Sequence, residues 1–229
     1  MALNTKTFKT RTITAVIFAA VMLSGLFIGK WTFIPLTAII MAGCIVEFSK
    51  LILSIYPGKA WMVVFSLIYI IIPLIFFADL GLMFFDNEGP AVYDPLFPCA
   101  VIFGIWINDT MAYIVGSLIG KTPFSSISPK KTWEGTIGGA LLCVLCIWGL
   151  SLIIPAAGKV ASIHWIAIGF ICAVAGTLGD LFESKLKRLA GVKDSGSIMP
   201  GHGGFLDRFD SLLFAAPAVW VYVMLFIRP

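Results

Sequence analysis

Carboxylates and cationic side chains recur beside apolar segments in the second half of this 229-residue chain. In the segment 179–188, Asp180 and Glu183 lie three residues apart and would share one face of a helix. Ser184 and Lys187 extend that face. Two carboxylates so placed suit a hard divalent cation such as Mg²⁺, because such ions prefer oxygen ligands and bring waters and substrate phosphates. We expect ligation at Asp180, which ends an apolar run, whereas Glu183 fits either ligation or a solvated helix end.

The glycine-rich segment 193–210 is a second candidate binding site. Glycines allow positive φ angles and close approach of the backbone to a ligand, and successive N–H groups in such a loop can bind an anion. The arginine of this segment offers a bidentate fork for phosphate, and its last two aspartates would stack on a helix. Its lone histidine fits a structural role at least as well as a catalytic one. The positions that we single out are Lys193, Asp194, His202, Gly203, Gly204, Asp207, Arg208 and Asp210.

Two further polar groups lie upstream. Asn108 and Asp109 fall within an apolar run, and a carboxylate at that depth needs a partner, an ion or a water-filled cavity. A buried polar network that joins helices is the alternative. The loop 125–135 places hydroxyl groups and lysines before a helix N-terminus, which suits phosphate binding, although the positive-inside rule would place lysines there equally well. The loop residues that we single out are Ser128, Lys130, Lys131 and Glu134.

Membrane helices must position these residues, because 59% of the chain is hydrophobic and only 12% is charged. An ordinary soluble domain has about twice that charged fraction. Crossing roughly 30 Å of hydrocarbon takes about 20 helical residues. We therefore predict an all-α polytopic membrane bundle of about seven transmembrane helices, within a range of six to nine, and an interfacial loop over 79–95. The expected helices cover 12–29, 31–49, 60–78, 96–119, 135–155, 162–182 and 211–227.

The distribution of lysine and arginine predicts the orientation. With seven spans and a cytoplasmic N-terminus, thirteen of these residues fall on the cytoplasmic side and three on the far side. We therefore expect the polar groups of the second half to meet at cytoplasmic helix ends.

Glycine pairs at four-residue spacing occur at 25/29, 116/120 and 135/139. In lipid, such pairs let helix backbones approach closely. Glycine is also simply common in membrane helices, so the pairs fit a helix interface and a neutral role equally well.

The segment 184–210 resembles the signature of the phosphatidate cytidylyltransferase family, whose members are also called CDP-diacylglycerol synthases. The matching positions are Ser184, Leu186, Lys187, Arg188, Lys193, Asp194, Gly196, Met199, Pro200, His202, Gly203, Gly204, Phe205, Asp207, Arg208, Phe209 and Asp210. The segments 108–110, 128–135 and 179–184 also resemble that family, in the same order, so the resemblance covers roughly 100–215. Met199 departs from the Leu, Ile or Phe that is usual there, and the first hundred residues carry no motif.

The resemblance implies an integral membrane enzyme of the bacterial inner membrane, often a homodimer, with an active site that faces the cytoplasm. Its reaction would be transfer of a nucleotidyl group from CTP to phosphatidic acid, giving CDP-diacylglycerol and pyrophosphate for phospholipid biosynthesis, with no nucleic acid as partner. The cofactor would be Mg²⁺, with Mn²⁺ as a substitute and a second, monovalent cation left open. Residues 1–95 would form membrane helices without a catalytic motif, and 96–229 the catalytic membrane domain.

The same resemblance implies roles for individual residues. The catalytic residues would be Asp180, Asp207, Lys193, Asp194 and Arg208. Two of these, Asp180 and Asp207, would hold the metal. The substrate-binding residues would be Asn108, Asp109, Ser128, Lys130, Lys131, Glu134, Glu183, Ser184, Lys187, Arg188, His202, Gly203, Gly204 and Asp210.

Three alternative functions stay open at this point. A CTP-dependent polyprenol or phytol kinase shares parts of the acidic and glycine-rich pattern, but it would release CDP in place of pyrophosphate. A CDP-archaeol synthase would act on an ether lipid. A transporter would distribute its polar residues through the bilayer, whereas here they are expected at one face.

Overall fold

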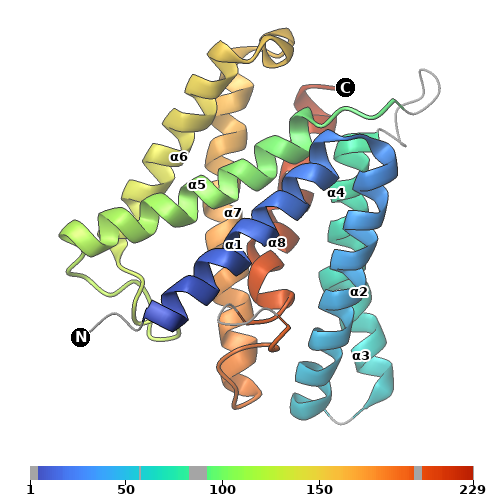
Figure 1. The fold of residues 1–229 in the computed structure, drawn as a ribbon, viewed down its shortest axis with the longest axis vertical. Helices are drawn as coiled ribbons and strands as arrows, with labels where there is room; N and C mark the ends of the chain where they lie inside the picture. The colour runs from blue at the N-terminus through green and yellow to red at the C-terminus, as the bar shows by residue number, and fades with distance from the viewer. Residues whose placement is uncertain (1–4, 57, 83–91, 199–202, 229) are drawn as a thin grey trace.

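The structure is a computed structural model that describes residues 5–56, 58–82, 92–198 and 203–228, and these residues form helices joined by loops, without a β-strand (Figure 1). The elements are α1 Thr5–Phe27, α2 Lys30–Ile55, α3 Lys59–Ser66, the π-helical turn η1 Leu67–Ile71, α4 Ile72–Leu82, α5 Leu96–Ile119, α6 Trp133–Ile153, the 3₁₀ turn η2 Pro155–Lys159, α7 Ser162–Leu189 and α8 Leu206–Phe226. Among the described residues, six helices are long and apolar enough to cross a membrane, with Trp61–Leu82 acting as one helix. The predicted all-α membrane bundle is confirmed.

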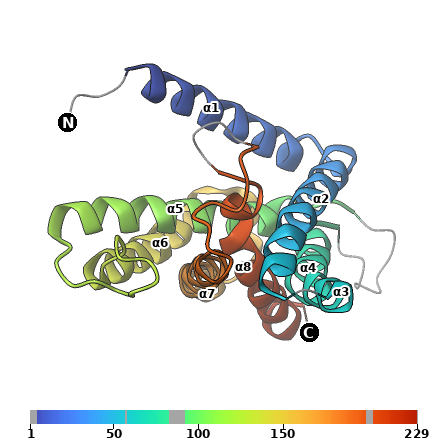
Figure 2. The same cartoon turned by 90° about the horizontal axis from the view of Figure 1, so that it is seen from below.

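The first helix differs from the six candidate spans in the length of its apolar part and in its placement. Its apolar part, Thr12–Phe27, is shorter than the six candidate spans. Seen from below, α1 lies along one side of the bundle (Figure 2). Its Phe18 ring packs against Trp106 of α5 and Phe209 of α8, at centroid distances of 6.2 and 5.8 Å. The six spans fall within the predicted range of six to nine. Helix α1 corresponds to the helix predicted over 12–29, which is too short in its apolar part to be counted among the six.

The expected interfacial loop over 79–95 is wrong in its first part. Helix α4 continues to Leu82, so Asp79 is a fully buried helix residue. Its Oδ2 accepts a hydrogen bond of 2.7 Å from Trp220 Nε1 on α8, which satisfies a carboxylate that the apolar surroundings would otherwise disfavour. Residues 83–91 lie outside the described residues, and 92–95 are not helical.

Most of the lysines and arginines lie in connections, or in helix ends beside them, that gather at one end of the bundle. The α2–α3, α5–α6 and α7–α8 connections lie in the lower half of Figure 1, as does the start of α1, whereas the C-terminus lies at the top. This arrangement agrees with the predicted alternation of the helices. The side of the membrane that each end faces remains a prediction.

Glycines bring α5 and α6 into close contact. A Cβ atom on Gly139 would lie 2.7 Å from Ala112 Cβ and 2.8 Å from Ala112 Cα, so only glycine lets the two helices approach this closely. One turn earlier, a Cβ atom on Gly135 would lie 2.9 Å from the Cα of Gly116. For these two pairs the structure supports the helix-interface interpretation, and the interface lies within the chain.

We predict that Gly139→Val destabilises the protein. The two added methyl groups and Cβ would overlap the backbone of Ala112, and overpacking of this kind costs about 1–3 kcal/mol of unfolding free energy. The matched control is Gly149→Val on the same helix, because no atom lies within 4 Å of a Cβ atom built there. Thermal unfolding in detergent should give a lower Tm for the first variant only. Equal Tm values would contradict the close α5–α6 contact.

One hydrophobic core runs through the whole bundle, from Met22 on α1 to Val223 on α8. The aromatic ring of Tyr69 in η1 contacts three helices within it: its centroid lies 5.1 Å from Phe48 on α2, 5.0 Å from Phe182 on α7 and 6.2 Å from Phe214 on α8. The N-terminal helices therefore pack directly against the helices that carry the polar motifs. The division at residue 95 remains a prediction.

Candidate active site

A cavity of about 590 Å³ lies where α5, the start of α6, α7 and the start of α8 meet. Its volume is within the range of about 300–1,000 Å³ that small-molecule sites occupy. The charged residues that line it are Lys130, Lys131, Lys187, Arg208, Asp109, Asp180, Asp194, Asp207 and Asp210. Asn108 and Ser128 line it as well. The motif segments that are far apart in the sequence therefore converge on one site, as the resemblance implies.

Three carboxylates on α7 and α8 form an acidic trio: Asp180, Glu183 and Asp210. One oxygen of each lies within 4.8 Å of the others. Gly179 makes this meeting possible, because a Cβ atom there would lie only 3.1 Å from the Cα of Ser211 on α8. The close approach of the two helices at Gly179 thus places Asp210 beside the two carboxylates of α7.

The acidic trio fits a divalent cation. Three carboxylates provide the oxygen ligands that hard cations prefer, and waters and substrate phosphates would complete the coordination. Glu183 is fully buried, and no hydrogen-bond partner for its Oε1 is found among the described residues. A buried carboxylate is costly unless opposite charges and hydrogen bonds satisfy it. Lys187 pairs with Oε2 of Glu183, which leaves Oε1 for a bound cation. Of the residues predicted to hold the metal, Asp180 belongs to this trio and Asp207 does not.

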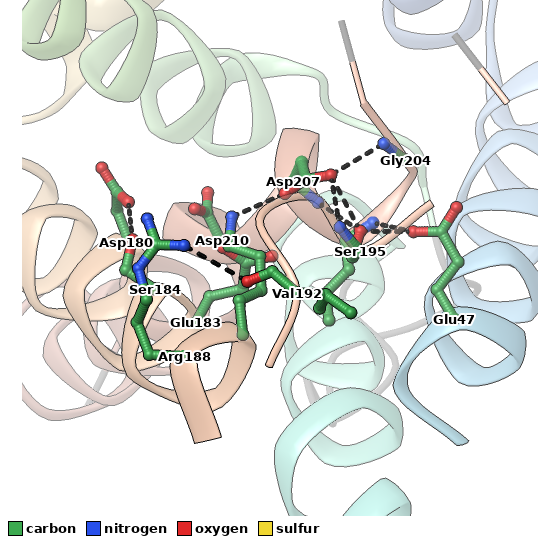
Figure 3. A network of polar contacts seen from close by, with 12 residues as sticks. Glu47, Asp180, Glu183, Ser184, Arg188, Val192, Ser195, Gly204, Asp207 and Asp210 are labelled. Atoms are coloured by element: carbon green, nitrogen blue, oxygen red, sulfur yellow. Dashed lines mark hydrogen bonds and ion pairs between the residues drawn. The ribbon is translucent and has the colours of Figure 1, made fainter. Parts of the chain in front are cut away.

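Asp207 instead forms hydrogen bonds with the loop between α7 and α8 (Figure 3). Its Oδ2 accepts hydrogen bonds from the backbone N–H groups of Ser195 (2.9 Å) and Gly204 (2.8 Å), and it lies 3.0 Å from Ser195 Oγ. Its Oδ1 accepts a hydrogen bond of 2.6 Å from Lys187 Nζ. Lys187 also forms an ion pair with Glu183, so this lysine connects the loop to the acidic trio.

The loop between α5 and α6 covers the cavity with cationic side chains. Lys131 forms an ion pair with Asp180, whose Oδ1 also accepts a hydrogen bond of 3.2 Å from Ser184 Oγ. Glu134 shapes the loop without lining the cavity: its carboxylate accepts hydrogen bonds from Thr122 Oγ1 (2.8 Å) and from the backbone N–H of Thr122 (3.2 Å). Asp180 is therefore held on one side by the loop and on the other by its own helix.

Several predicted site residues lie beside the cavity and do not line it. Arg188 donates a hydrogen bond of 3.2 Å to the carbonyl of Val192, and Lys193 is exposed. Gly203 has a φ of 82°, which favours glycine, and it packs against the Asp207 side chain. His202 lies outside the described residues. Arg188 and Gly203 thus shape the loop, and the predicted contacts of all four positions with substrate remain predictions.

Glu47 is a contact residue of this site that was not predicted, and no role was predicted for Ser195. Glu47 lies in α2, and its Oε2 accepts hydrogen bonds from Ser195 Oγ (2.7 Å) and from the backbone N–H of Leu206 (3.0 Å). The available signal was an acidic residue inside an apolar segment predicted to span the membrane, which is unusual enough to suggest a function.

Comparison with known proteins agrees with the geometry. A model described as the cytidylyltransferase family matches residues 54–226. The chain is 47% identical over 125 residues to phosphatidate cytidylyltransferase from Synechocystis sp.. This alignment covers 53% of the present chain and 41% of the Synechocystis protein. The phosphatidate cytidylyltransferase of Aquifex aeolicus is 44% identical over 121 residues, an alignment that covers 52% of this chain and 44% of that protein. The phosphatidate cytidylyltransferase of Staphylococcus saprophyticus is 43% identical over 143 residues, an alignment that covers 62% of this chain and 53% of that protein. The chain thus matches about half of the length of these relatives.

Proposed function

Because this chain belongs to the cytidylyltransferase family, we propose that it transfers the cytidylyl group of CTP to phosphatidic acid, giving CDP-diacylglycerol and pyrophosphate. The observation that carries the proposal is one cavity, in a bundle of membrane helices, that is lined by both cationic side chains and carboxylates. The relatives named phosphatidate cytidylyltransferase support the choice of substrates.

In this reaction a phosphate oxygen of phosphatidic acid attacks the α-phosphorus of CTP. The new bond joins the two phosphates, the bond from the α-phosphorus to the bridging oxygen breaks, and pyrophosphate leaves with the electron pair. The lipid phosphate is already a nucleophile, so no nucleophilic side chain is required. The protein has to bring two anions together in line, and fixed cations achieve this by offsetting their repulsion.

The lining residues suit these two tasks. Lys130 and Arg208 are exposed to the cavity and can bind phosphate oxygens. The acidic trio Asp180, Glu183 and Asp210 would hold a divalent cation, which we propose is Mg²⁺. When bound, that cation would neutralise phosphate charge and orient the reacting groups. Lys187, which also lines the cavity, forms ion pairs with both Glu183 and Asp207.

The setting of the site follows from the two substrates. The chain is an integral membrane protein, as its apolar helices show. Lipid phosphate lies at headgroup depth and CTP arrives from water, so the cavity has to lie near one end of the helices. We propose that this end faces the cytoplasm of a bacterial cell, and that the protein acts as a homodimer in the inner membrane.

The test is a product assay with protein purified in detergent, given phosphatidic acid in mixed micelles, radiolabelled CTP and Mg²⁺. We expect cytidine label in the lipid fraction and release of equimolar pyrophosphate. Release of CDP with phosphorylation of a polyprenol would instead identify a lipid kinase. Faster turnover of an ether lipid than of the ester would indicate a CDP-archaeol synthase. Absence of any turnover of CTP would refute the proposed function.

A further inference from the structure

We propose that Glu47 of α2 is a positioning residue for the active site, which holds the loop between α7 and α8 and the first turn of α8 in place. The consequence for catalysis rests on the proposed function, whereas the anchoring itself does not. Sequence analysis placed no site residue before 95, and the match to the family begins at residue 54, after Glu47.

The contacts of Glu47 join α2 to a loop about 150 positions away in the sequence. Only 3% of Glu47 is exposed. Its Oε2 accepts hydrogen bonds from Ser195 Oγ (2.7 Å) and the Leu206 N–H (3.0 Å), across sequence separations of 148 and 159 residues (Figure 3). A buried carboxylate in an apolar helix is costly unless it is hydrogen-bonded, so these two bonds stabilise the contact of Ser195 and Leu206 with α2.

A short chain of hydrogen bonds leads from Glu47 to the acidic trio. Ser195 Oγ, which contacts Glu47, also lies 3.0 Å from Asp207 Oδ2 and 3.3 Å from the Asp207 N–H. Asp207 contacts Lys187, and Lys187 forms an ion pair with Glu183. A displacement of the loop away from α2 would therefore reach Glu183 through side chains that are in direct contact.

Glu47 also fixes the N-terminus of α8. The first N–H groups of a helix have no partner within the helix, and a negative charge beside them is stabilising. Helix α8 begins at Leu206, whose N–H donates to Glu47, so a residue of α2 performs the capping role. Asp207 lies on this first turn and Asp210 directly after it, so fraying of the turn would move both.

The loop is shaped to accept the Glu47 side chain. A Cβ atom on Gly196 or on Gly204 would collide with the Glu47 carboxylate, so any side chain there would push the loop away from α2. A Cβ atom on Gly43, one helical turn before Glu47, would collide with the ring of Phe205. The absence of a side chain at Gly196 and Gly204 therefore has a direct steric reason, which is the carboxylate of a residue outside the signature.

The experiment compares Glu47→Ala, Glu47→Gln and Ser195→Ala with a control, Thr37→Val. Thr37 is another buried polar residue of α2, and its hydroxyl donates only to the carbonyl of Phe33 within the same helix. Two quantities are measured in detergent for each variant: the hydrogen–deuterium exchange of peptides that cover 193–210, and kcat and KM for CTP in the product assay.

We expect Glu47→Ala to speed exchange in 193–210 and to lower kcat by about 10²-fold, the scale of loss for misplaced reacting groups. Glu47→Gln should recover most of both, because an amide oxygen can accept the same two hydrogen bonds. Thr37→Val should leave both at the wild-type values. Ser195→Ala should change both in the direction of Glu47→Ala, and the double variant should be no worse than Glu47→Ala alone, because the two residues act in one chain of contacts.

Wild-type exchange in 193–210 together with wild-type kcat for Glu47→Ala would overturn the proposal. Equal effects of Glu47→Ala and Glu47→Gln on exchange and on kcat would also overturn it, because a hydrogen-bond acceptor at position 47 would then not be enough to hold the loop. If Glu47→Ala fails to fold, unchanged exchange and kcat in Ser195→Ala would equally contradict the anchoring role. The exchange measurement needs no turnover, so the anchor can be tested even if the assignment of substrates is wrong.

Discussion

Asp180→Asn is expected to lower turnover of CTP by about 10³-fold, the upper range for loss of one electrostatic contact to the reacting phosphates. The change keeps the size of the side chain and removes its charge. One oxygen of Asp180 lies within 4.8 Å of the carboxylates of Glu183 and Asp210, so the variant would hold a divalent cation with two charges in place of three. It would also leave Lys131 without its ion-pair partner.

The measurement is incorporation of labelled CTP into lipid over a range of Mg²⁺ concentrations, with direct binding of Mn²⁺ followed by electron paramagnetic resonance. We expect weaker Mn²⁺ binding and a higher requirement for Mg²⁺ than in the wild type. The matched control is Asp94→Asn, because Asp94 Oδ1 caps α5 through the Leu96 N–H (2.9 Å) and does not line the cavity. Near-normal turnover of the Asp180 variant at saturating Mg²⁺ would show that this carboxylate does not hold the metal.

Asp207→Asn is expected to lower kcat by about 10²-fold through displacement of the loop. The reason is the donor pattern around this carboxylate. One oxygen accepts from two backbone N–H groups, and the other accepts from the ammonium group of Lys187. An asparagine amide has only one acceptor oxygen, so its NH₂ group must face either the loop donors or the lysine, and one set of hydrogen bonds is lost.

The same variant separates two roles for Asp207. The family resemblance predicts a metal ligand, in which case Asp207→Asn should raise the Mg²⁺ requirement as much as Asp180→Asn does. The hydrogen bonds of both Asp207 oxygens favour a structural role, in which Asp207 holds the loop between α7 and α8 in place. In that case the Mg²⁺ requirement should stay near that of the wild type while kcat falls. A parallel Mg²⁺ titration of the two variants, with exchange measured over 193–210, distinguishes the roles. A raised Mg²⁺ requirement without faster exchange would contradict the loop role.

The sequence by itself determined the class of the fold and several of the residues that line the cavity. Apolar segments of about 20 residues can only be membrane helices, because in lipid each backbone group needs an internal hydrogen bond. The polar residues had to gather where water and ions can reach them, and for this reason Asp109, Asp180 and Arg208 could be assigned to one cavity before its geometry was known. These properties depend on composition and on local order along the chain.

The helix boundaries were predicted less well, since contacts between helices set them. Helix α8 was expected to begin at residue 211, but it begins at Leu206, because Glu47 satisfies the N–H of its first residue. The span expected over 162–182 continues as helix α7 to Leu189, in agreement with the helical face predicted for 179–188, and Lys187 pairs with Glu183 one turn earlier. Asp79 was assigned to a loop because its partner, Trp220, lies 141 residues away.

Only the tertiary structure decided which carboxylates meet. The approach of α7 and α8 at Gly179 brings Asp210 to Asp180, and the path of the loop turns Asp207 toward Ser195 and away from that pair. Side chains three residues apart can be placed on one face from helical periodicity alone. No periodicity relates positions on different helices, because the crossing of the helices and the course of the loop fix those distances, and both depend on packing throughout the bundle.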